Sequence, residues 1–536
     1  MQEVKGTILD VVNRRIVKGV VEVESGRIKQ IREADEVPDQ FVLPGFIDSH
    51  VHIESSMLVP SEFARLAVRH GTVATVSDPH EIANVCGMEG VEYMIENGEK
   101  VPFKFYFGAP SCVPATPFET AGAVLGVDEV TRLLDREEIP YLSEMMNWPG
   151  VLQRDEEVMA KIHAARERGK PVDGHAPGLT GDKAEQYASA GITTDHECFT
   201  LKEAVDKLKA GMKIAIREGS AARNYDELLP LLGDYPGKIM FCSDDKHPDD
   251  LIRGYFDQLA ARTLAKGYDL FDLLKAFCIL PIDHYGLDVG KLQPGDPADF
   301  IVVKEPETME VIQTWIDGEC VYDRGSVLIP RVEVNPINNF VSRTTRPSEF
   351  RVDAGRDTVP VIVAEDGQIV TGKSFETLSA AEGDLQPDPG RDILKITVVN
   401  RYQEALPATG FIKNFGIREG AIASSVAHDS HNIIAVGSSN RYLSEAVNLV
   451  MEHRGGVAAV DADRKEILPL PVAGLMSDQT GEEVAGGYER LDRTAKEMGS
   501  NLKAPFMVIS FMALLVIPSL KISDKGMFDG ETFEFI

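Results

Sequence analysis

The chain has 536 residues, of which 43% are hydrophobic, so it is long enough for two to four domains with substantial cores. It carries 85 acidic and 55 basic side chains, a formal net charge of −30 at pH 7. This acidity argues against nucleic acid or an anionic membrane as a partner, because binding phosphate groups requires basic patches. The six cysteines are scattered without a Cys-x-x-Cys pair, which favours free thiols in a reducing, cytoplasmic setting.

The N-terminal 40 residues predict short β-strands and show no secretion signal. Strands are expected over residues 4–10, 15–23 and 27–31, with a turn at Ser25-Gly26. A second β-rich stretch is expected around residues 290–303, after the central part of the chain.

Between residues 41 and 288, apolar strands alternate with amphipathic helices. The predicted strands are 41–52, 72–78, 103–109, 141–146, 171–175, 193–197, 212–218 and 239–244. The predicted helices are 61–70, 88–99, 128–138, 155–169, 182–190, 201–210, 226–232 and 249–266. Eight such units over about 240 residues match the size of one (β/α)₈ barrel. An open doubly wound sheet is the alternative, but no Gly-x-Gly-x-x-Gly segment or phosphate-binding loop supports it.

Potential metal ligands lie at the C-terminal ends of the predicted strands, where barrel enzymes carry their chemistry. His50 and His52 alternate along one strand, so both point to the same side. The strand ends together offer His50, His52, Glu144, His175, His196 and Asp244. Each has an ordinary explanation by itself; Asp244, for example, could cap the next helix. Their joint placement around one rim predicts a metal site.

The residue types indicate which ions and which chemistry this site supports. Imidazole and carboxylate ligands suit Zn²⁺, Fe²⁺ and Mn²⁺. One catalytic zinc takes three protein ligands, so six ligands predict two ions that share a bridging carboxylate. Such ions lower the pKa of a bound water, and a neighbouring carboxylate can take its proton. The pattern therefore predicts a two-metal hydrolase.

A third, α/β region is expected from about residue 345 to the end. Its predicted strands are 361–364, 369–371, 395–399 and 432–436, and its predicted helices are 441–453 and 481–496. The segment His428-Asp429-Ser430-His431-Asn432 is either a polar turn or a functional element: a lid, a cross-domain contribution to the substrate pocket, or a site for an extra ion. The apolar run 504–520 is short and interrupted by prolines, which favours a buried core over a membrane span.

Several segments, in this order along the chain, resemble the adenine deaminases of the amidohydrolase superfamily. They are residues 50–57 (HVHIESSM), 77–81 (SDPHE), 143–147 (SEMMN), 173–175 (DGH), 243–245 (SDD) and 420–432 (GAIASSVAHDSHN). Many relatives bridge their metals with a carboxylated lysine on strand 4. This chain has Glu144 there and no lysine, which favours the adenine deaminases over dihydroorotase-like or hydantoinase-like enzymes.

The resemblance implies an α/β fold: a (β/α)₈ TIM-type barrel over residues 41–288, a small β-sandwich from residues 1–40 plus 289–340, and a C-terminal α/β domain over 345–536. It also implies that His50 and His52 bind the more buried ion, Glu144 bridges, and His175 and His196 hold the second ion. Asp244 would contact metal and act as general base. Asp245 is the alternative, since an alternating strand points only one of the two inward.

The reaction implied is deamination of free adenine to hypoxanthine and ammonia, in purine salvage. Hydroxide would attack C6 while Asp244 accepts its proton. The candidates for protonating ring nitrogen N1 are His80, Glu81, Glu197 and His247. Substrate contacts are expected from Glu54, Ser55, His80 and Glu81. The expected cofactors are two Mn²⁺ or Fe²⁺ ions, with Zn²⁺ as the alternative, in a dimer or tetramer.

Two other functions stay open at this point. One is a different binuclear amidohydrolase of the same fold that cleaves a cyclic amide or a dipeptide, or acts on a related purine. Activity on adenine compared with cyclic amides separates it from the first. The other is a non-catalytic metal-binding scaffold, which bound metal without any hydrolysis would support.

Overall fold

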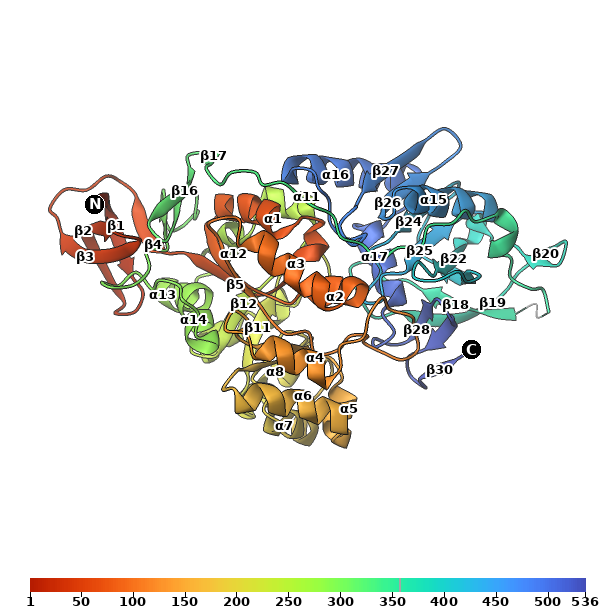
Figure 1. Cartoon of the computed structure of the whole chain (residues 1–536), viewed down its shortest axis with the longest axis horizontal. Coiled ribbons are helices and arrows are strands. Elements are labelled where there is room, and N and C mark those ends of the chain that lie inside the picture. The colour runs from red at the N-terminus through yellow and green to blue at the C-terminus, as the bar shows by residue number, and fades with distance from the viewer. Residues whose placement is uncertain (356–357) are drawn as a thin grey trace.

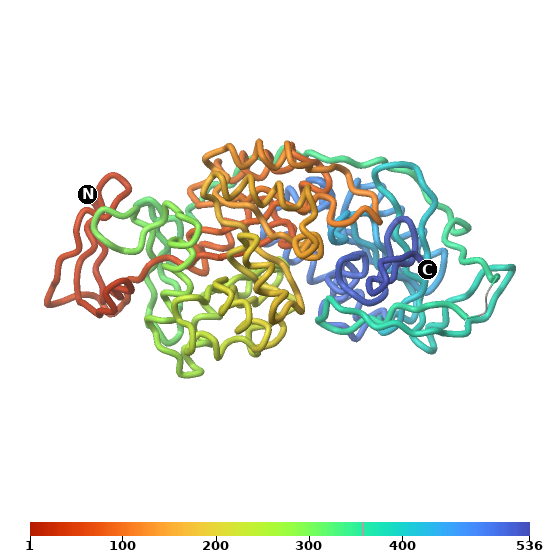
Figure 2. Tube along the Cα trace, turned by 90° about the horizontal axis from the view of Figure 1, so that it is seen from below, coloured from red at the N-terminus to blue at the C-terminus, as the bar shows by residue number. Residues whose placement is uncertain are grey.

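The structure, a computed structural model, describes residues 1–355 and 358–536. Three parts follow one another along its long axis: the strands β1–β3 at one end, the barrel in the middle and the C-terminal sheet at the other end (Figure 1). A view turned by 90° keeps this order, with the N-terminal end and the C-terminal part at opposite ends of the molecule (Figure 2).

A flanking sheet combines the start of the chain with the stretch that follows the barrel. Its members are β1 (Gln2–Asp10), β2 (Arg15–Glu24), β3 (Arg27–Glu33), β4 (Phe41–Pro44), β14 (Phe300–Val303), β15 (Val311–Ile316), β16 (Glu319–Asp323) and β17 (Ser326–Val327). They form one sheet in the order β17-β16-β15-β14-β4-β1-β2-β3. The amide of Ile28 donates to the carbonyl of Asp296 at 2.9 Å, which brings the two flanks together. The β-sandwich predicted here is thus one continuous sheet that folds over its own apolar core.

Eight parallel units close the central barrel. Its strands are β5 (Phe46–His52), β6 (Thr72–Ser77), β7 (Lys104–Phe107), β8 (Leu142–Met145), β9 (Val172–Gly174), β10 (Thr194–Asp195), β11 (Lys213–Arg217), β12 (Ile239–Cys242) and its short continuation β13 (Asp244–Asp245). The ring closes where β13 pairs with β5, Asp244 opposite Val51. A bridge between Ala109 and Leu142 joins β7 to β8, and the Thr193 amide joins β10 to β9 through the Val172 carbonyl.

The barrel helices follow their strands as the apolar spacing predicts. They include α1 (Pro60–Ala67), α2 (His80–Cys86), α3 (Met88–Gly98), α4 (Val127–Leu134), α6 (Glu156–Glu167), α7 (Gly181–Ser189), α8 (Leu201–Lys209), α11 (Pro248–Arg253) and α12 (Phe256–Ala265). The Asp155 side chain caps α6 by accepting from the Val158 amide at 3.1 Å. The single helix predicted over 249–266 is interrupted at Gly254, which adopts an extended conformation.

One predicted strand is divided. The sequence predicts a single strand over residues 41–52, but the structure ends β4 at Pro44 and starts β5 at Phe46. β4 pairs with β1 and β14 in the flanking sheet, whereas β5 belongs to the barrel. The intervening Gly45 lies so close to Val73 that a Cβ atom there would clash at 2.3 Å. One continuous apolar segment therefore contributes a strand to each of two sheets, and Gly45 lies between the two strands.

The C-terminal region is built on a second eight-stranded sheet. In spatial order its strands are β19 (Gly372–Thr377), β18 (Thr358–Val363), β23 (Ala408–Lys413), β22 (Ile393–Val399), β25 (Ile433–Gly437), β24 (Ala421–Ser424), β26 (Gly456–Val460) and β27 (Lys465–Pro469). Ala421 and Ala423 pack under α15 (Asn440–Glu452), while Ile422 between them joins the large core shared with the barrel. The predicted strand at 369–371 is irregular backbone instead.

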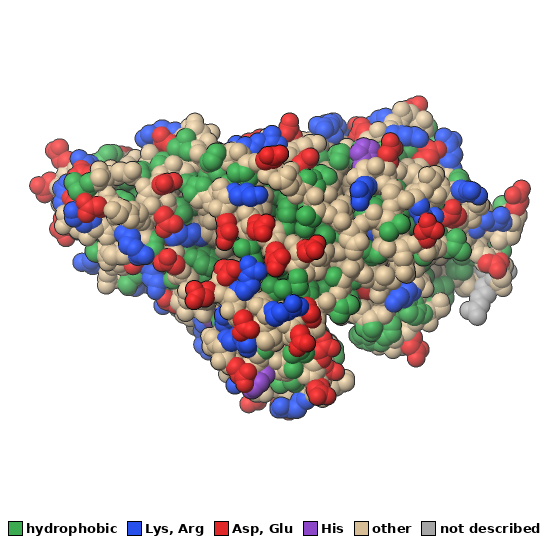
Figure 3. Space-filling view, viewed as in Figure 1, with side chains coloured by type: hydrophobic (Ala, Val, Ile, Leu, Met, Phe, Trp, Pro, Cys, Tyr) green, Lys and Arg blue, Asp and Glu red, His purple; other side chains and the backbone are tan. Residues whose placement is uncertain are grey.

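Elements of the C-terminal region lie against the barrel. Helix α16 (Gly481–Glu497) packs on α11 and α1, and the amide of Ser477 donates to the carbonyl of Met57 at 2.8 Å. The apolar run 504–520 forms α17 (Pro505–Ser510) and a short 3₁₀ turn, buried between the two parts. Within the described residues, no helix combines the length and apolarity needed to cross a membrane. Acidic and basic side chains are interspersed over the face seen in Figure 3.

Candidate active site

His50 and His52 bring their rings together at the C-terminal end of β5. Every residue of this strand is buried, and the Nε2 atoms of the two rings lie 3.2 Å apart. The Nδ1 atom of His52 lies 3.1 Å from the backbone carbonyl of Asp78. A carbonyl oxygen only accepts, so in the neutral ring Nδ1 carries the proton and the lone pair of Nε2 faces the other ligand-type groups. This is the orientation that a metal ligand requires.

Glu144, at the end of β8, lies between two sets of histidines. Its Oε2 atom is 2.8 Å from Nδ1 of His175 and 3.1 Å from Nε2 of His196. Its Oε1 atom is 3.5 Å from Nε2 of His52 and 3.6 Å from Nδ1 of His80. One carboxylate thus presents each oxygen to a different group of imidazoles, which is the arrangement of a bridging ligand.

Asp244 completes the ring of ligand-type groups from β13. Its Oδ1 atom lies 3.1 Å from Nε2 of His52, and its Oδ2 atom accepts a hydrogen bond from Nη1 of Arg217 at 2.7 Å. Arg217 is fully buried and also forms an ion pair with Glu197. Burial alone would raise the pKa of Asp244, but the Arg217 guanidinium and the neighbouring histidines hold it well below its usual value.

Both Asp244 and Asp245 line the cavity, although regular alternation would point only one of them inward. The alternation is interrupted because Asp244 has a φ of 55°, in the left-handed region that aspartate tolerates better than most residues. Asp244 faces the histidines, whereas Asp245 accepts a hydrogen bond from Oγ of Ser55 at 2.5 Å. Both carboxylates thus reach the cavity, and they differ in the residues they contact.

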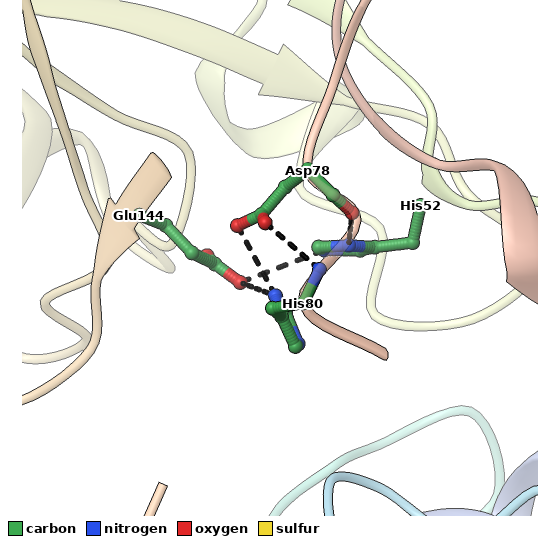
Figure 4. A group of neighbouring side chains, drawn as sticks. All are labelled: His52, Asp78, His80 and Glu144. Carbon is green, nitrogen blue, oxygen red and sulfur yellow. Dashed lines mark hydrogen bonds and ion pairs between the residues drawn. The ribbon is translucent and has the colours of Figure 1, made fainter. Parts of the chain in front are cut away.

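A further group of four side chains converges on the same place: His52, Asp78, His80 and Glu144 (Figure 4). Nδ1 of His80 lies 3.1 Å from Oδ2 of Asp78, which directly follows β6. Asp78 was not predicted as a ligand from the sequence. Arg217 was also not predicted as the ion-pair partner of Asp244. Both lie at the ends of predicted strands, the second and the seventh, so the strand-end criterion applied to every strand would have found them.

The predicted substrate-contact residues divide into two pairs. His80 and Glu81 line the cavity beside the histidine cluster. Glu54 and Ser55 are buried but are not on the cavity wall: Glu54 accepts a hydrogen bond from the Ile82 amide, and Ser55 donates to Asp245. The structure thus places Glu54 and Ser55 behind the cavity wall, and their contact with substrate stays a prediction.

Of the other candidates for protonating the substrate, Glu197 is on the cavity wall and is engaged by Arg217. His247 lines a different, larger cavity, where its ring packs edge-on against Tyr488 with centroids 4.7 Å apart. The position of His247 therefore does not favour it over His80 or Glu197 as the proton donor.

The donor set fits divalent metal ions. Nε2 of His196, Nδ1 of His80 and Oδ2 of Asp78 are buried and close to ligand-type atoms, but none of the three forms a hydrogen bond of acceptable geometry within the described chain. Three groups of ligand-type atoms, each within 4.8 Å of one another, meet here: His52/Asp78/His80/Glu144, Glu144/His175/His196 and His50/His196/Asp244. Glu144 and His196 are each shared between two groups. Imidazole and carboxylate donors of this kind suit Mn²⁺, Fe²⁺ and Zn²⁺.

The electrostatics of the cluster agree with a cation site. Burial raises the pKa of a carboxylic acid, yet His175 and His196 hold the pKa of Glu144 well below its usual value. Burial lowers the pKa of an imidazole, yet Glu144 and Glu197 raise the pKa of His175 to about 9. Because a metal ligand must be deprotonated, metal binding at His175 would release a proton from its ring.

The C-terminal region forms part of the cavity wall. The cavity is small and is lined from the barrel by the cluster itself together with Met146 and Ala222. The C-terminal region contributes Ile369, His428, Asp429, Phe511 and Leu514. Of the roles weighed for the segment 428–432, the structure favours the cross-domain contribution to the pocket.

A closed (β/α)₈ barrel with imidazole and carboxylate groups on its rim defines the protein as a barrel hydrolase. Residues 41–321 match the amidohydrolase family, and residues 368–534 match the adenine deaminase C-terminal domain. An adenine deaminase from Salinibacter ruber is 56% identical over 99% of this chain and 98% of its own length. One from Sulfurovum is 54% identical over 100% of this chain and 99% of its own. The chain therefore belongs to the amidohydrolase family and, within it, to the adenine deaminases.

Among solved structures, a β-aspartyl dipeptidase from Fervidobacterium islandicum AW-1 matches with a TM-score of 0.47 and 15% identity. The match covers 62% of this chain and 98% of that protein. At this level of similarity it contributes nothing to the assignment of the site.

Proposed function

We propose that this protein hydrolyses free adenine to hypoxanthine and ammonia. The observation that carries the proposal is the position of Glu144 between two sets of buried histidines, in a chain that matches known adenine deaminases over nearly its whole length. The amino group to be replaced sits on a ring carbon flanked by ring nitrogen, so the reaction needs an activated water, a base for its proton and an acid for the leaving group.

Six residues would hold two divalent cations: His50, His52, Glu144, His175, His196 and Asp244. Glu144 would lie between the ions, because its two oxygens face different histidines. When bound, the cations supply a water activated for attack on C6 of adenine. We infer Mn²⁺ or Fe²⁺ from the mixed imidazole and carboxylate donors, with Zn²⁺ as the alternative.

Asp244 accepts the proton of the attacking water in this proposal. Its carboxylate faces the cluster through Oδ1, and Arg217 fixes Oδ2. The same ion pair keeps Asp244 ionised and prevents its rotation away from the cluster. Asp245 is bound by Ser55 instead, which favours Asp244 as the base.

His80 delivers a proton to the purine in this proposal. Its Nδ1 atom faces Asp78 and Glu144, and its Nε2 atom faces Glu81 and Asp429 at 3.7 and 3.9 Å. The ring therefore spans the space between the ligand cluster and the substrate cavity. Glu81 lies on the side of the ring that faces away from the cluster.

We assign the reaction to purine salvage, because deamination of free adenine gives hypoxanthine with its purine ring intact, and other enzymes can reuse that ring. All six cysteines are free, which supports a reducing, cytoplasmic environment. A small molecule as the partner, rather than nucleic acid or membrane, agrees with the net charge of −30. The dimer or tetramer expected from the sequence stays a prediction that analytical ultracentrifugation tests.

The experiment that tests this function is a comparison of substrates with the purified metal-loaded enzyme. Adenine, guanine, dihydroorotate and a β-aspartyl dipeptide are incubated separately, and ammonia and the purine product are quantified. Hypoxanthine and ammonia formed in equal amounts from adenine alone would support the proposal. Turnover of a cyclic amide or dipeptide without turnover of adenine would overturn it.

A further inference from the structure

Asp429 is a buried carboxylate on the wall of the substrate cavity, and one of its oxygens is unpaired within the described residues. Its side chain is 4% exposed, and its Oδ2 atom has no hydrogen-bond donor in the part of the chain that the structure describes. It comes from the C-terminal region, not from the barrel. A buried carboxylate with an unused acceptor atom is costly unless a ligand supplies the missing donor.

The carboxylate lies one ring away from the proposed metal ligands. Its Oδ1 atom is 3.9 Å from Nε2 of His80, a distance too long for a hydrogen bond, while Nδ1 of the same ring faces Asp78 and Glu144. His80 thus lies near Asp429 without a hydrogen bond to it, which leaves the carboxylate oxygens on this wall of the cavity able to accept from a bound ligand.

The neighbouring wall is apolar and partly aromatic. Phe511 and Leu514 line the cavity together with Ile369, and the ring of Phe511 stacks on that of His428 with centroids 5.1 Å apart. Such a wall suits the face of a flat ligand ring. A donor at the edge of that ring could then form a hydrogen bond to Asp429.

The turn that carries Asp429 is held in place by contacts to the barrel. His428 and His431 both form hydrogen bonds to the carboxylate of Glu81, and the side chain of Asn432 donates to the carbonyl of Thr120 at 2.8 Å. His431 accepts from the Ala427 amide through Nδ1, so its Nε2 carries the proton donated to Glu81. An Nε2 in that state cannot ligate a metal, so this group is a hydrogen-bonded network and not a third ion site.

The charged groups around Asp429 affect its pKa, and therefore whether it can accept a hydrogen bond from a ligand. Burial and the carboxylate of Glu81 raise the pKa of Asp429 to about 6, while His80 and His428 oppose that shift. Near neutral pH the group is mostly ionised and accepts hydrogen bonds only.

We propose that Asp429 recognises the substrate by accepting a hydrogen bond from the N–H of its five-membered ring. Adenine has two kinds of donor: the C6 amino group, which must lie at the reacting water, and this ring N–H. Its N1 and N3 can only accept. Asp429 would thus select the free base, because a purine substituted at N9 has no ring N–H to offer. The inference rests on the proposed adenine hydrolysis.

The test compares Asp429→Ala with Asp429→Asn and a matched control, using adenine and 9-methyladenine as substrates. The control is Glu119→Gln, which alters a nearby buried carboxyl that is not on the cavity wall. In Asp429→Ala the kcat/KM for adenine should fall roughly 10- to 100-fold, mainly through KM, since one charge-assisted hydrogen bond is lost. The metal content should stay at two per chain. Asp429→Asn should recover part of the loss, because its amide oxygen still accepts.

The ratio of kcat/KM for adenine to that for 9-methyladenine is the deciding readout. It should fall in Asp429→Ala and stay at the wild-type value in Glu119→Gln. An unchanged ratio in Asp429→Ala, or loss of metal from that variant, would overturn the role of Asp429 while leaving adenine hydrolysis by the wild type intact. A wild-type enzyme that does not turn over adenine would instead overturn the proposed function.

Discussion

Asp244 and Arg217 form a buried ion pair between neighbouring strands of the barrel, with Nη1 of Arg217 2.7 Å from Oδ2 of Asp244. The same guanidinium neutralises Glu197. Two carboxylates on the rim of the site thus depend on one buried cation. The pair couples the orientation of the proposed base to the folding of the barrel.

Replacing Arg217 by Met is expected to lower the free energy of unfolding by about 3–5 kcal/mol, because two buried carboxylates lose their counter-charge. Urea denaturation followed by circular dichroism measures the change. Arg223→Met is the control: that side chain is 49% exposed and pairs with Glu218 at 3.7 Å, so its loss should cost less than about 1 kcal/mol. An equal decrease in the free energy of unfolding in the two variants would show that the buried ion pair contributes no more to stability than the exposed one.

Glu144→Gln is expected to bind fewer than two metals per chain and to lose most of its activity, because a neutral amide bridges two cations poorly. Elemental analysis of the purified variant gives the metal count. Glu54→Gln is the matched control, since Glu54 is an equally buried carboxyl that is not on the cavity wall. Two metals and normal turnover in Glu144→Gln would remove Glu144 as the bridge.

His80→Asn separates a proton donor from a metal ligand. We expect the variant to keep two metals per chain while kcat falls by roughly 10²–10⁴, the usual contribution of general acid–base catalysis. Metal content and single-turnover rates are measured on the same preparation. A variant that loses one metal would place His80 among the ligands, as its contacts with Asp78 and Glu144 also permit.

Much of the site follows from the period of two along a strand combined with the rule that barrel chemistry lies at strand ends. That reasoning brings together His50, His52, Glu144, His175, His196 and Asp244, and the structure places all six in one cluster. It does not foresee that Asp244 adopts a left-handed conformation, which brings Asp245 to the cavity as well. Backbone irregularities of this kind leave no pattern in the spacing of residues.

The sequence does not predict which residues of the C-terminal region line the cavity. His428 and Glu81 are separated by 347 positions, and nothing in the local pattern of either segment predicts that they meet. The cluster of polar residues at 428–432 marked the segment as unusual, but its role depends on how the C-terminal region docks. The division of 41–52 between two sheets has the same origin, because a continuous apolar strand does not reveal its partners.

Lys521 gives a prediction about stability rather than catalysis. It is fully buried, donates to the carbonyls of Ile369 and Phe511, and burial lowers its pKa from 10.5 to about 7. Between those two values the unfolded chain binds the proton and the folded chain does not. The free energy of unfolding should therefore rise with pH over this window, and the burial penalty is fully present only below pH 7.

The wild type should gain about 2 kcal/mol from Lys521 between pH 7 and pH 9, and Lys521→Met should lack this gain. The measurement is the difference between the two proteins in urea denaturation at each pH, so that other titrating groups cancel. Parallel pH profiles for the wild type and the variant would contradict a lowered pKa for Lys521.

The central claim is that a pair of cations on the barrel rim supports the hydrolysis of adenine. The most direct measurement is ammonia release from adenine by the apo-protein titrated separately with Mn²⁺, Fe²⁺ and Zn²⁺, with bound metal counted at each step. We predict that activity rises to a maximum at two metals per chain, with adenine but not adenosine as substrate. Two bound metals with no turnover of adenine would contradict the account.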